Sequence, residues 1–412
     1  MKKRGIQMSS YFLRCISCKK EYEPRPGLYF CEKCGPIMGT LEVIYDYEKI
    51  KENPVVVQKN FYKKASMYQF DFLLPTKAKG KFDPYVGGTP LYKFDLLGLK
   101  DLMLKYDGSN PSSSYKDRAS SIAINMALDE KNDTVFCAST GNAASSLAML
   151  NAHTPMETYI FVPSTIPGGK RAQLEISGAK VFAVEGTYDE VYDLSLELGL
   201  KKGWYCRHAA INPYLLEGKK TGAFEIAVQN DFKVPDYVLV GVGDGTVVSS
   251  LYKGFKEFKE IGLIESIPKI IGVQAEGIAA IKHVFDKGEP YTPHPIKGST
   301  VADSISVGTP RDVIKACKYV AESGGYYVTV SDEEILEAIS ELGKETGLFA
   351  EPAAVAPYAG LKKLIKEGKI RKEDSVCVAV TGNGLKDIKA VEGVISSKSY
   401  SKEEIVKMFE TQ

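Results

Sequence analysis

Short apolar runs alternate with segments of helical periodicity through most of this chain. The run YVLVGV at residues 237–242 is continuously apolar, which is typical of a strand buried on both faces of a parallel sheet. This βαβ alternation predicts an α/β fold of doubly wound, mostly parallel sheets in two subdomains. Strands are expected at residues 91–94, 134–138, 159–163, 180–184, 237–242, 269–274, 326–330 and 375–380. Helices are expected at residues 119–129, 142–151, 168–177, 188–202, 246–259, 332–346 and 353–367.

Length, composition and charge exclude some classes of partner. At 412 residues the chain is long enough for two or three domains with large buried cores. Its net charge of +1 gives no reason to expect nucleic acid or an anionic membrane as a partner. No apolar run approaches the length of a membrane span, and the basic first residues lead into polar ones instead of a signal-peptide core. We therefore expect a cytoplasmic protein that binds neither nucleic acid nor membrane.

Four of the eight cysteines are grouped near the N-terminus. Cys15 and Cys18 form one C-x-x-C pair, and Cys31 and Cys34 form a second pair after twelve intervening residues. Two such pairs supply four thiolates for a tetrahedral ion, so we predict a structural zinc ribbon over residues 10–45. The alternative is a ribbon-shaped subdomain that keeps its cysteines but binds no metal. A nucleic-acid-binding ribbon is disfavoured because no basic stripe interleaved with aromatic residues accompanies it.

A lysine lies in a hydroxyl-rich segment at the start of an expected helix. Residues 109–121 read SNPSSSYKDRASS, and Lys116 stands just before the mostly small and apolar residues 119–129. The partial positive charge of a helix N-terminus disfavours the ammonium form of such an amine, and burial would lower its pKa further. An activated amine is what Schiff-base chemistry with an aldehyde cofactor requires. Taken alone, the segment is better explained as ordinary first-turn charge, so the assignment depends on finding the rest of a cofactor site.

Three loops that follow expected strands carry residues suited to such a cofactor. In residues 139–146, STGNAASS, Asn142 stands at the start of an expected helix with its side-chain amide free to bind a ligand. A role as the helix N-cap explains this asparagine about equally well. In residues 240–248 glycines precede a helix, and free backbone amides at a helix N-terminus bind phosphate. The spacing of these glycines matches neither a P-loop nor a dinucleotide fingerprint. In residues 380–387 Thr381 supplies a hydroxyl before a glycine-containing turn, which an ordinary α/β turn explains about as well.

Together the four segments describe one ligand. An amine for a Schiff base, an amide for a phenolic oxygen, a cup for one phosphate and a hydroxyl for a ring nitrogen match pyridoxal 5′-phosphate. Ligands of open α/β sheets bind outside the carboxyl ends of the strands, where these loops arise. The sequence therefore predicts a pyridoxal-phosphate site formed by the ends of several strands.

Several segments resemble, in the same order, the motifs of the threonine synthases, which belong to the tryptophan-synthase-β-like (fold type II) pyridoxal-phosphate enzymes. Residues 109–118 resemble the lysine motif N-P-T-G-S-F-K-D-R, and NPYLLEGKKT at residues 212–221 resembles N-P-Y-R-L-E-G-Q-K-T. The three loops resemble the family's S-S-G-N-T segment, its glycine-rich phosphate loop and its T-G-x-G-L-K-D segment. The sequence EPAA at residues 351–354 matches a further segment, so the resemblance spans about residues 15–390.

The resemblance implies a role for each residue of the site. Lys116 would hold the cofactor as a Schiff base and act as the general base, Asn142 would bind the cofactor's 3-oxygen, and Thr381 would meet its pyridine nitrogen. The cofactor phosphate would be bound by Gly243, Asp244, Gly245 and Thr246. The substrate would be bound by Ser113, Ser114, Ser139, Thr140 and Lys386. The implied reaction converts O-phosphohomoserine and water into threonine and phosphate, in a homodimeric enzyme.

Two departures from the family pattern concern the substrate. Leu215 stands where the family has an arginine expected to bind the substrate phosphate, and Ala143 stands where it has a threonine. Leucine offers nothing equivalent to the bidentate guanidinium, and Lys219 or Lys386 is a candidate replacement. A related β-elimination or β-replacement enzyme, such as a serine/threonine dehydratase or an O-phosphoserine-using synthase, is therefore the alternative. A catalytically silent binding protein is a third hypothesis.

The expected division of the chain follows these assignments. After the cysteine ribbon, residues 46–94 read as irregular structure leading into a strand. The larger, cofactor-binding domain is predicted from residues 46–128 and 215–395, and the smaller α/β domain from residues 129–214. A C-terminal helix is expected within residues 396–412.

Overall fold

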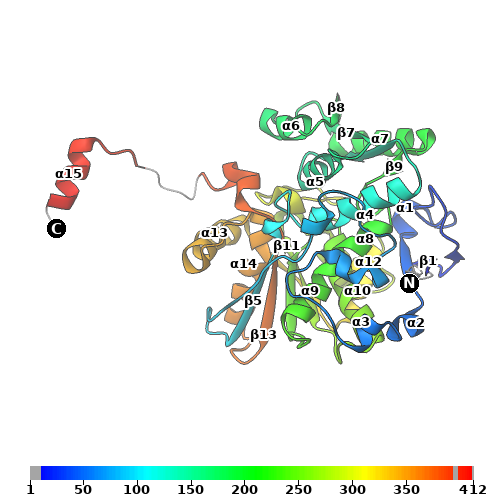
Figure 1. The fold of residues 1–412 in the computed structure, drawn as a ribbon. Helices are drawn as coiled ribbons and strands as arrows, with labels where there is room; N and C mark the ends of the chain where they lie inside the picture. Colours follow the sequence, from blue (N-terminus) through cyan, green and yellow to red (C-terminus); the bar gives the residue numbers. More distant parts are fainter. Residues whose placement is uncertain (1–10, 393–397, 411–412) are drawn as a thin grey trace, which may run out of the picture.

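Three sheets organise the part of the chain that the structure describes, which is residues 11–392 and 398–410 of this computed structural model (Figure 1). Residue 10, where the ribbon was predicted to begin, and the predicted boundary between residues 395 and 396 lie outside the described residues. None of the described helices is long and apolar enough to cross a membrane.

The N-terminal sheet is a small antiparallel ribbon. Its central strand β1 (Tyr11–Cys15) pairs with β2 (Glu21–Tyr22) and with β3 (Leu41–Tyr45), and the short helix α1 (Gly35–Met38) precedes β3. The ribbon is attached to the main body through its backbone. The buried Lys253 amine donates to Val43 O at 2.7 Å, and the buried Lys315 amine donates to Leu41 O at 3.1 Å.

The smaller of the two main sheets is entirely parallel, with the strand order β8-β7-β6-β9. Helices α5 and α7 both pack on β6 and β7, while α4 contacts α5 and β9. Figure 1 shows α5, α6 and α7 around this sheet, at the top of the view. The elements are β6 (Thr134–Ala138), β7 (Glu157–Pro163), β8 (Lys180–Val184), β9 (Tyr205–Cys206), α4 (Lys116–Asp129), α5 (Asn142–Asn151), α6 (Gly168–Glu175) and α7 (Tyr188–Lys202).

The larger sheet has the order β12-β11-β10-β13-β5-β4, and every pair is parallel except the edge pair β4–β5. Its strands are β4 (Leu91–Phe94), β5 (Asp101–Tyr106), β10 (Tyr237–Gly241), β11 (Lys269–Ala275), β12 (Tyr326–Val330) and β13 (Ser375–Val380). Its helices are α8 (Tyr214–Lys219), α9 (Thr221–Gln229), α10 (Thr246–Glu260), α11 (Ala280–Lys287), α12 (Val313–Glu322), α13 (Asp332–Thr346) and α14 (Pro352–Lys366).

Both faces of the larger sheet are buried, which explains why its strands read as continuous apolar runs. Successive side chains of a strand point to opposite faces. Val238 and Val240 of β10 accordingly belong to one hydrophobic core, whereas Leu239 belongs to a second core that α13 and α14 cover. The predicted α/β class with parallel sheets is confirmed, and every predicted strand lies within two residues of an observed one.

Strand β5 was not predicted, although it lies in the interior of the larger sheet between β13 and β4. Its charged Lys105 interrupts the apolar pattern that identifies a buried strand. In the fold this side chain is fully buried, and its amine donates to Glu225 Oε2 at 2.7 Å and to Thr89 O at 2.6 Å. The partner that neutralises Lys105 lies 120 residues away, so the local sequence gave no sign that the lysine is buried.

The remaining elements are short or peripheral. The segment expected to be irregular contains α2 (Tyr47–Lys51), α3 (Pro54–Val57) and two 3₁₀ helices before β4. At the other end, α15 (Lys402–Glu410, red in Figure 1) carries no buried residue. The 3₁₀ helices are Met67–Leu73, Asp83–Tyr85, Asp107–Ser109, Glu276–Ile278, Asp303–Ile305 and Gly384–Ala390.

Candidate active site

A cavity of about 810 Å³ lies where the carboxyl ends of strands from both main sheets meet. The loops after β6, β10 and β13 all line it, as the sequence predicted from their positions. Residues at the starts of α4 and α14 and in the segment after β9 also line it, as do residues from the stretches 163–170, 187–192 and 296–311. The predicted site residues that line the cavity are Ser114, Lys116, Ser139, Thr140, Asn142, Gly243, Asp244, Gly245, Thr246 and Thr381.

Lys116 is the first residue of α4, so its amine lies at the start of a 14-residue helix. Among the described residues, this amine makes no hydrogen bond or ion pair. Burial lowers the pKa of the Lys116 amine, the nearby Glu351 carboxylate opposes the shift, and the Arg207 guanidinium adds to it. An unpartnered amine with a lowered pKa in a cavity is the kind of group that condenses with an aldehyde.

The backbone around Lys116 is fixed to the third loop. Tyr115 N donates to Thr381 O at 2.8 Å, and Asn383 N donates to Ser113 O at 3.0 Å. Ser113 adopts a left-handed conformation, with φ of 64°, which allows the chain to turn between these two contacts. The lysine and Thr381, which are 265 residues apart in sequence, are therefore held beside one another by main-chain hydrogen bonds.

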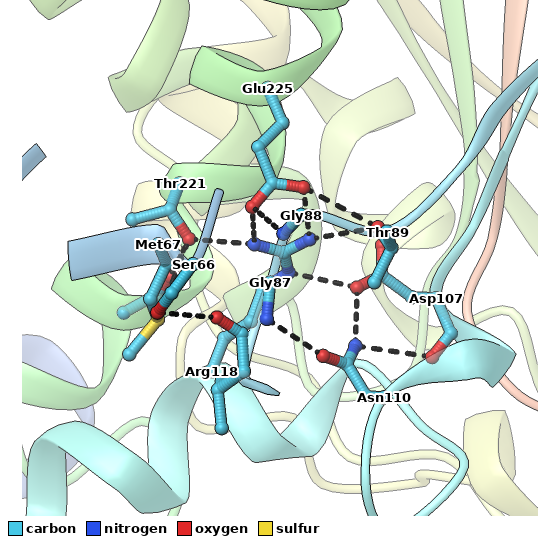
Figure 2. Close-up of polar contacts among 12 residues, drawn as sticks. Ser66, Met67, Gly87, Gly88, Thr89, Asp107, Asn110, Arg118, Thr221 and Glu225 are labelled. Atoms are coloured by element: carbon cyan, nitrogen blue, oxygen red, sulfur yellow. Dashed lines mark hydrogen bonds and ion pairs between the residues drawn. The ribbon is translucent and has the colours of Figure 1, made fainter. Parts of the chain in front are cut away.

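A buried ionic network holds the N-terminal part of α4 in place (Figure 2). The Arg118 guanidinium donates to Asp107 Oδ1 at 2.8 Å and to both carboxylate oxygens of Glu225 at 2.6 and 2.8 Å. It also donates to the hydroxyls of Thr221 and Thr89. All of the guanidinium nitrogens are therefore paired, and this fully buried charge is compensated. The network explains the arginine of the lysine motif as a residue that positions α4.

Asn142 lies at the first position of α5, and its side chain does not cap the helix. Instead, Nδ2 donates to both carboxylate oxygens of Glu351, at 2.9 and 3.0 Å. Burial raises the pKa of the Glu351 carboxyl, while the bond from Asn142 opposes that shift. The N-cap explanation of this asparagine is thus excluded. Its amide is held inside the cavity by Glu351, which belongs to the EPAA segment but had no predicted role.

The glycine-rich turn forms a close-fitting cup at the N-terminus of α10. A Cβ atom on Gly243 would approach Ile305 Cα to 3.0 Å, and Gly245 has a φ of +93° that other residues rarely adopt. Asp244 turns its carboxylate toward Arg311 N, 2.7 Å away, and burial raises the pKa of this carboxyl to about 7. The turn therefore presents backbone amides at the helix start, which is the arrangement that binds a phosphate group.

Lys219 reaches the same cup. It is fully buried at the end of α8, and its amine donates to Thr246 Oγ1 at 2.6 Å. Burial lowers the pKa of Lys219 well below its usual range, and the positive charges of Lys116 and Arg207 lower it further. A buried amine that has no carboxylate partner among the described residues is suited to bind an anion, which would favour its charged form. From the sequence, Lys219 was expected only as a candidate replacement for the missing arginine.

The two other residues predicted to bind substrate lie elsewhere. Ser113 does not line the cavity, and the Lys386 amine is engaged by Ser145 Oγ at 2.9 Å and by Ser112 O at 3.2 Å. Leu215 is buried in the hydrophobic core and also does not line the cavity, whereas Ala143 does. The position of the family arginine is thus a core position in this chain.

Two consecutive residues after β9 were missed by the sequence analysis. Arg207 and His208 line the cavity because the two-residue strand β9 delivers them to the same edge of the smaller sheet. His208 Nε2 accepts from Ala138 N at 2.9 Å, and burial together with the neighbouring Arg207 and Arg311 lowers its pKa to about 3. The imidazole is therefore neutral. A strand of two residues leaves no periodic pattern that would have identified this segment.

The four predicted metal ligands lie together in the N-terminal ribbon. The Sγ atoms of Cys15, Cys18, Cys31 and Cys34 are all within 4.8 Å of one another. Cys18 Sγ and Cys31 Sγ are 3.7 Å apart. A zinc ion bound tetrahedrally by thiolates at about 2.3 Å holds the sulfur atoms about 3.8 Å apart, so the cluster fits this ion in both donor type and spacing.

Comparisons with known proteins agree with this arrangement. A family described as pyridoxal-phosphate dependent enzyme matches residues 82–382. The threonine synthase of Methanosarcina acetivorans is 39% identical over 92% of this chain and 93% of its own length, and that of Methanocaldococcus jannaschii is 40% identical over 91% and 92%.

Solved structures share the fold at lower identity. Threonine deaminase isoform 2 from Solanum lycopersicum has a TM-score of 0.63 and 23% identity over 77% of this chain and 86% of that one. Maize serine racemase has a TM-score of 0.64 and 19% identity over 80% and 93%. The family match over residues 82–382, the relatives that cover nearly the whole chain and the geometry of the cavity all agree. The chain belongs to the pyridoxal-phosphate-dependent enzymes and, within them, to the threonine synthase family.

Proposed function

We propose that this protein converts O-phosphohomoserine and water into threonine and phosphate in the cavity around Lys116. The observation that carries the proposal is the meeting of four features where strands of both main sheets end. These are the Lys116 amine, which has no partner among the described residues, the Asn142 amide, the glycine-lined cup and the Thr381 hydroxyl. Membership of the threonine synthase family over 92% of the chain supports the same reaction.

The residues of the cavity fit pyridoxal phosphate one group at a time. Lys116 would hold the aldehyde carbon as a Schiff base, and the Asn142 amide would face the 3-oxygen. Backbone amides from Gly243 to Thr246, together with the Lys219 amine, would bind the phosphate. Thr381 would meet the pyridine nitrogen, and a hydroxyl at that position does not enforce protonation of the ring. Bound pyridoxal phosphate supplies an electron sink for the carbon atoms of the amino acid.

The chain's own groups would then move protons and orient the substrate. Burial lowers the pKa of the Lys116 amine, which favours a role as general base, and this amine would transfer protons at Cα and Cβ. The hydroxyls of Ser139 and Thr140, at the start of α5, would bind the substrate carboxylate with help from the helix N-terminus. Phosphate would leave from Cγ, and water would add at Cβ.

The ribbon is proposed to hold one structural zinc ion through its four cysteines. No carboxylate or histidine belongs to this cluster among the described residues, so the ion would have no group beside it to activate water. The homodimer and the cytoplasmic location stay predictions made from the sequence.

A panel of four substrates tests the proposed reaction. The holoenzyme is assayed for release of phosphate and of keto acid from O-phosphohomoserine, O-phosphoserine, serine and threonine, with Lys116→Ala as the control. The proposal requires phosphate release and threonine formation from O-phosphohomoserine. Keto acid from serine or threonine without phosphate release would instead identify a dehydratase, the alternative that Ala143 in the cavity and the buried Leu215 favour.

A further inference from the structure

Arg207 is a buried cation with unused donors. Its side chain is 1% exposed, Nε donates to Ser120 Oγ at 3.1 Å, and neither Nη1 nor Nη2 has a partner among the described residues. Buried polar groups are nearly always hydrogen-bonded, and a buried charge without a partner is costly. Because Arg207 also lines the cavity, the two free nitrogens indicate a ligand that enters from there.

The position of Arg207 places its guanidinium near Lys116. Ser120 follows Lys116 by four residues on α4, so the two side chains share one face of the helix. The guanidinium that Ser120 holds is therefore a neighbour of the lysine amine, which agrees with its effect on the pKa of Lys116.

The other anionic groups of the proposed reaction already have sites. The cofactor phosphate would occupy the cup at the start of α10 with Lys219, and the substrate carboxylate would occupy the start of α5. The phosphoryl group of the substrate is the third anion, and the family's usual arginine for it is replaced by Leu215, which the core buries. A guanidinium with two adjacent free N–H groups matches the geometry of a phosphate bidentately.

We propose that Arg207 binds the phosphoryl group of the substrate through Nη1 and Nη2, and so replaces the family arginine from a different element of the fold. This inference rests on the proposed function, because it assigns one group of that substrate. Arg207 would also hold the phosphate as it leaves from Cγ, since the same donors face the departing anion.

The test compares phosphorylated and unphosphorylated ligands on the holoenzyme. The cofactor absorbance is titrated with a phosphonate analogue of O-phosphohomoserine and with 2-aminobutyrate, which has the amino and carboxyl groups but no phosphate. Inorganic phosphate is tested as a competitor. Arg207→Met is expected to weaken the phosphonate by about 30-fold or more, because two charge-assisted hydrogen bonds are lost, and to change 2-aminobutyrate by less than about 3-fold.

Two further variants make the result specific. Arg207→Lys keeps the charge but not the fork, so an intermediate loss of about tenfold is expected. Arg311→Met is the matched control, because the Arg311 guanidinium also lines the cavity but is already paired with Asp193 at 3.3 Å. We expect that variant to change phosphonate affinity by less than about 3-fold, since this guanidinium is already paired with Asp193 through Nη2 and is partly exposed.

Each outcome decides between the inference and the function. If Arg207→Met binds the phosphonate as tightly as the wild type does, the inference is overturned. If the methionine variant does not fold, the same criterion applies to Arg207→Lys. Phosphate release by the wild type would still uphold the proposed function in either case. Equal weakening of both amino-acid ligands, or weaker binding of the cofactor itself, would also overturn the inference. Absence of phosphate release from O-phosphohomoserine by the wild type would remove the function and the inference together.

Discussion

Lys219→Met is the substitution whose consequences the structure defines most sharply. Lys219 is fully buried, has no carboxylate partner among the described residues and donates to Thr246 Oγ1 at the cup proposed for the cofactor phosphate. Removing its charge should relieve the folded apoprotein of an uncompensated buried cation. The same change should weaken the binding of pyridoxal phosphate. Stability and affinity are therefore expected to move in opposite directions.

The size of the affinity loss follows from the contact. A hydrogen bond to a charged group contributes about 1.5–3 kcal/mol, which corresponds to about 10- to 150-fold in the cofactor dissociation constant. A 30-fold loss reduces the stabilisation that saturating cofactor confers by about 2 kcal/mol.

The pH dependence has a defined sign. The pKa of Lys219 in the folded protein lies below its value in the unfolded chain. Below about pH 10 the unfolded chain therefore binds this proton more tightly than the folded protein does, which lowers the stability of the wild type. The stability advantage of Lys219→Met over the wild type should therefore be present at neutral pH and shrink as pH is raised toward 10.

The adjacent lysine supplies a matched contrast. Lys220 is equally buried, but its amine is paired with Glu217 Oε2 at 2.5 Å and with Glu257 Oε2 at 2.6 Å. Lys220→Met would leave Glu217 and Glu257 to share one buried cation, Lys253, and should destabilise the protein by about 3–5 kcal/mol. Thermal and urea unfolding of both apoproteins, with fluorescence titration of the cofactor, measures all of these quantities. Wild-type cofactor affinity in Lys219→Met, or an apoprotein destabilised as much as Lys220→Met, would refute the reasoning.

Three other substitutions test the remaining assignments. Lys116→Ala should abolish the yellow colour of the holoenzyme and lower kcat/KM by at least about 10²-fold. In the wild type, borohydride should bleach this colour and leave a modified Lys116 peptide. An unmodified peptide would contradict the assignment. Metal analysis should find one zinc ion per chain. Cys18→Ser, or treatment with a chelator, should remove this ion and lower the Tm. A wild-type protein that holds no metal, and whose Tm a chelator does not change, would reject the zinc ribbon. Arg118→Met removes the cation that pairs with Asp107 and leaves Glu225 with Lys105 alone. It should lower the free energy of unfolding by about 3–5 kcal/mol, a loss that an unchanged urea midpoint would disprove.

Local sequence patterns predicted the scaffold of the site. The apolar runs located the strands, and because parallel strands end at one edge of a sheet, the loops with Asn142, Gly243 and Thr381 were expected to meet. Lys116 at the start of a helix was expected beside them. These predictions depend on backbone periodicity and on the order of strands and helices, which residues near one another in sequence determine.

The electrostatic identity of the site depended on contacts that no local pattern encodes. Lys105 is a strand residue only because Glu225 neutralises it, and Arg207 faces the cavity only because the short strand β9 lies beside β6.

The sequence by itself thus determined the α/β fold, the lysine and the loops that form the cofactor site. The tertiary structure alone decided that Leu215 is a core residue and that Lys219 contacts Thr246 of the proposed phosphate cup. It also decided that two nitrogens of Arg207 have no partner among the described residues. The physical reason is that the free energy of a buried charge depends on which distant groups surround it, whereas a strand or a helix start depends on its immediate neighbours.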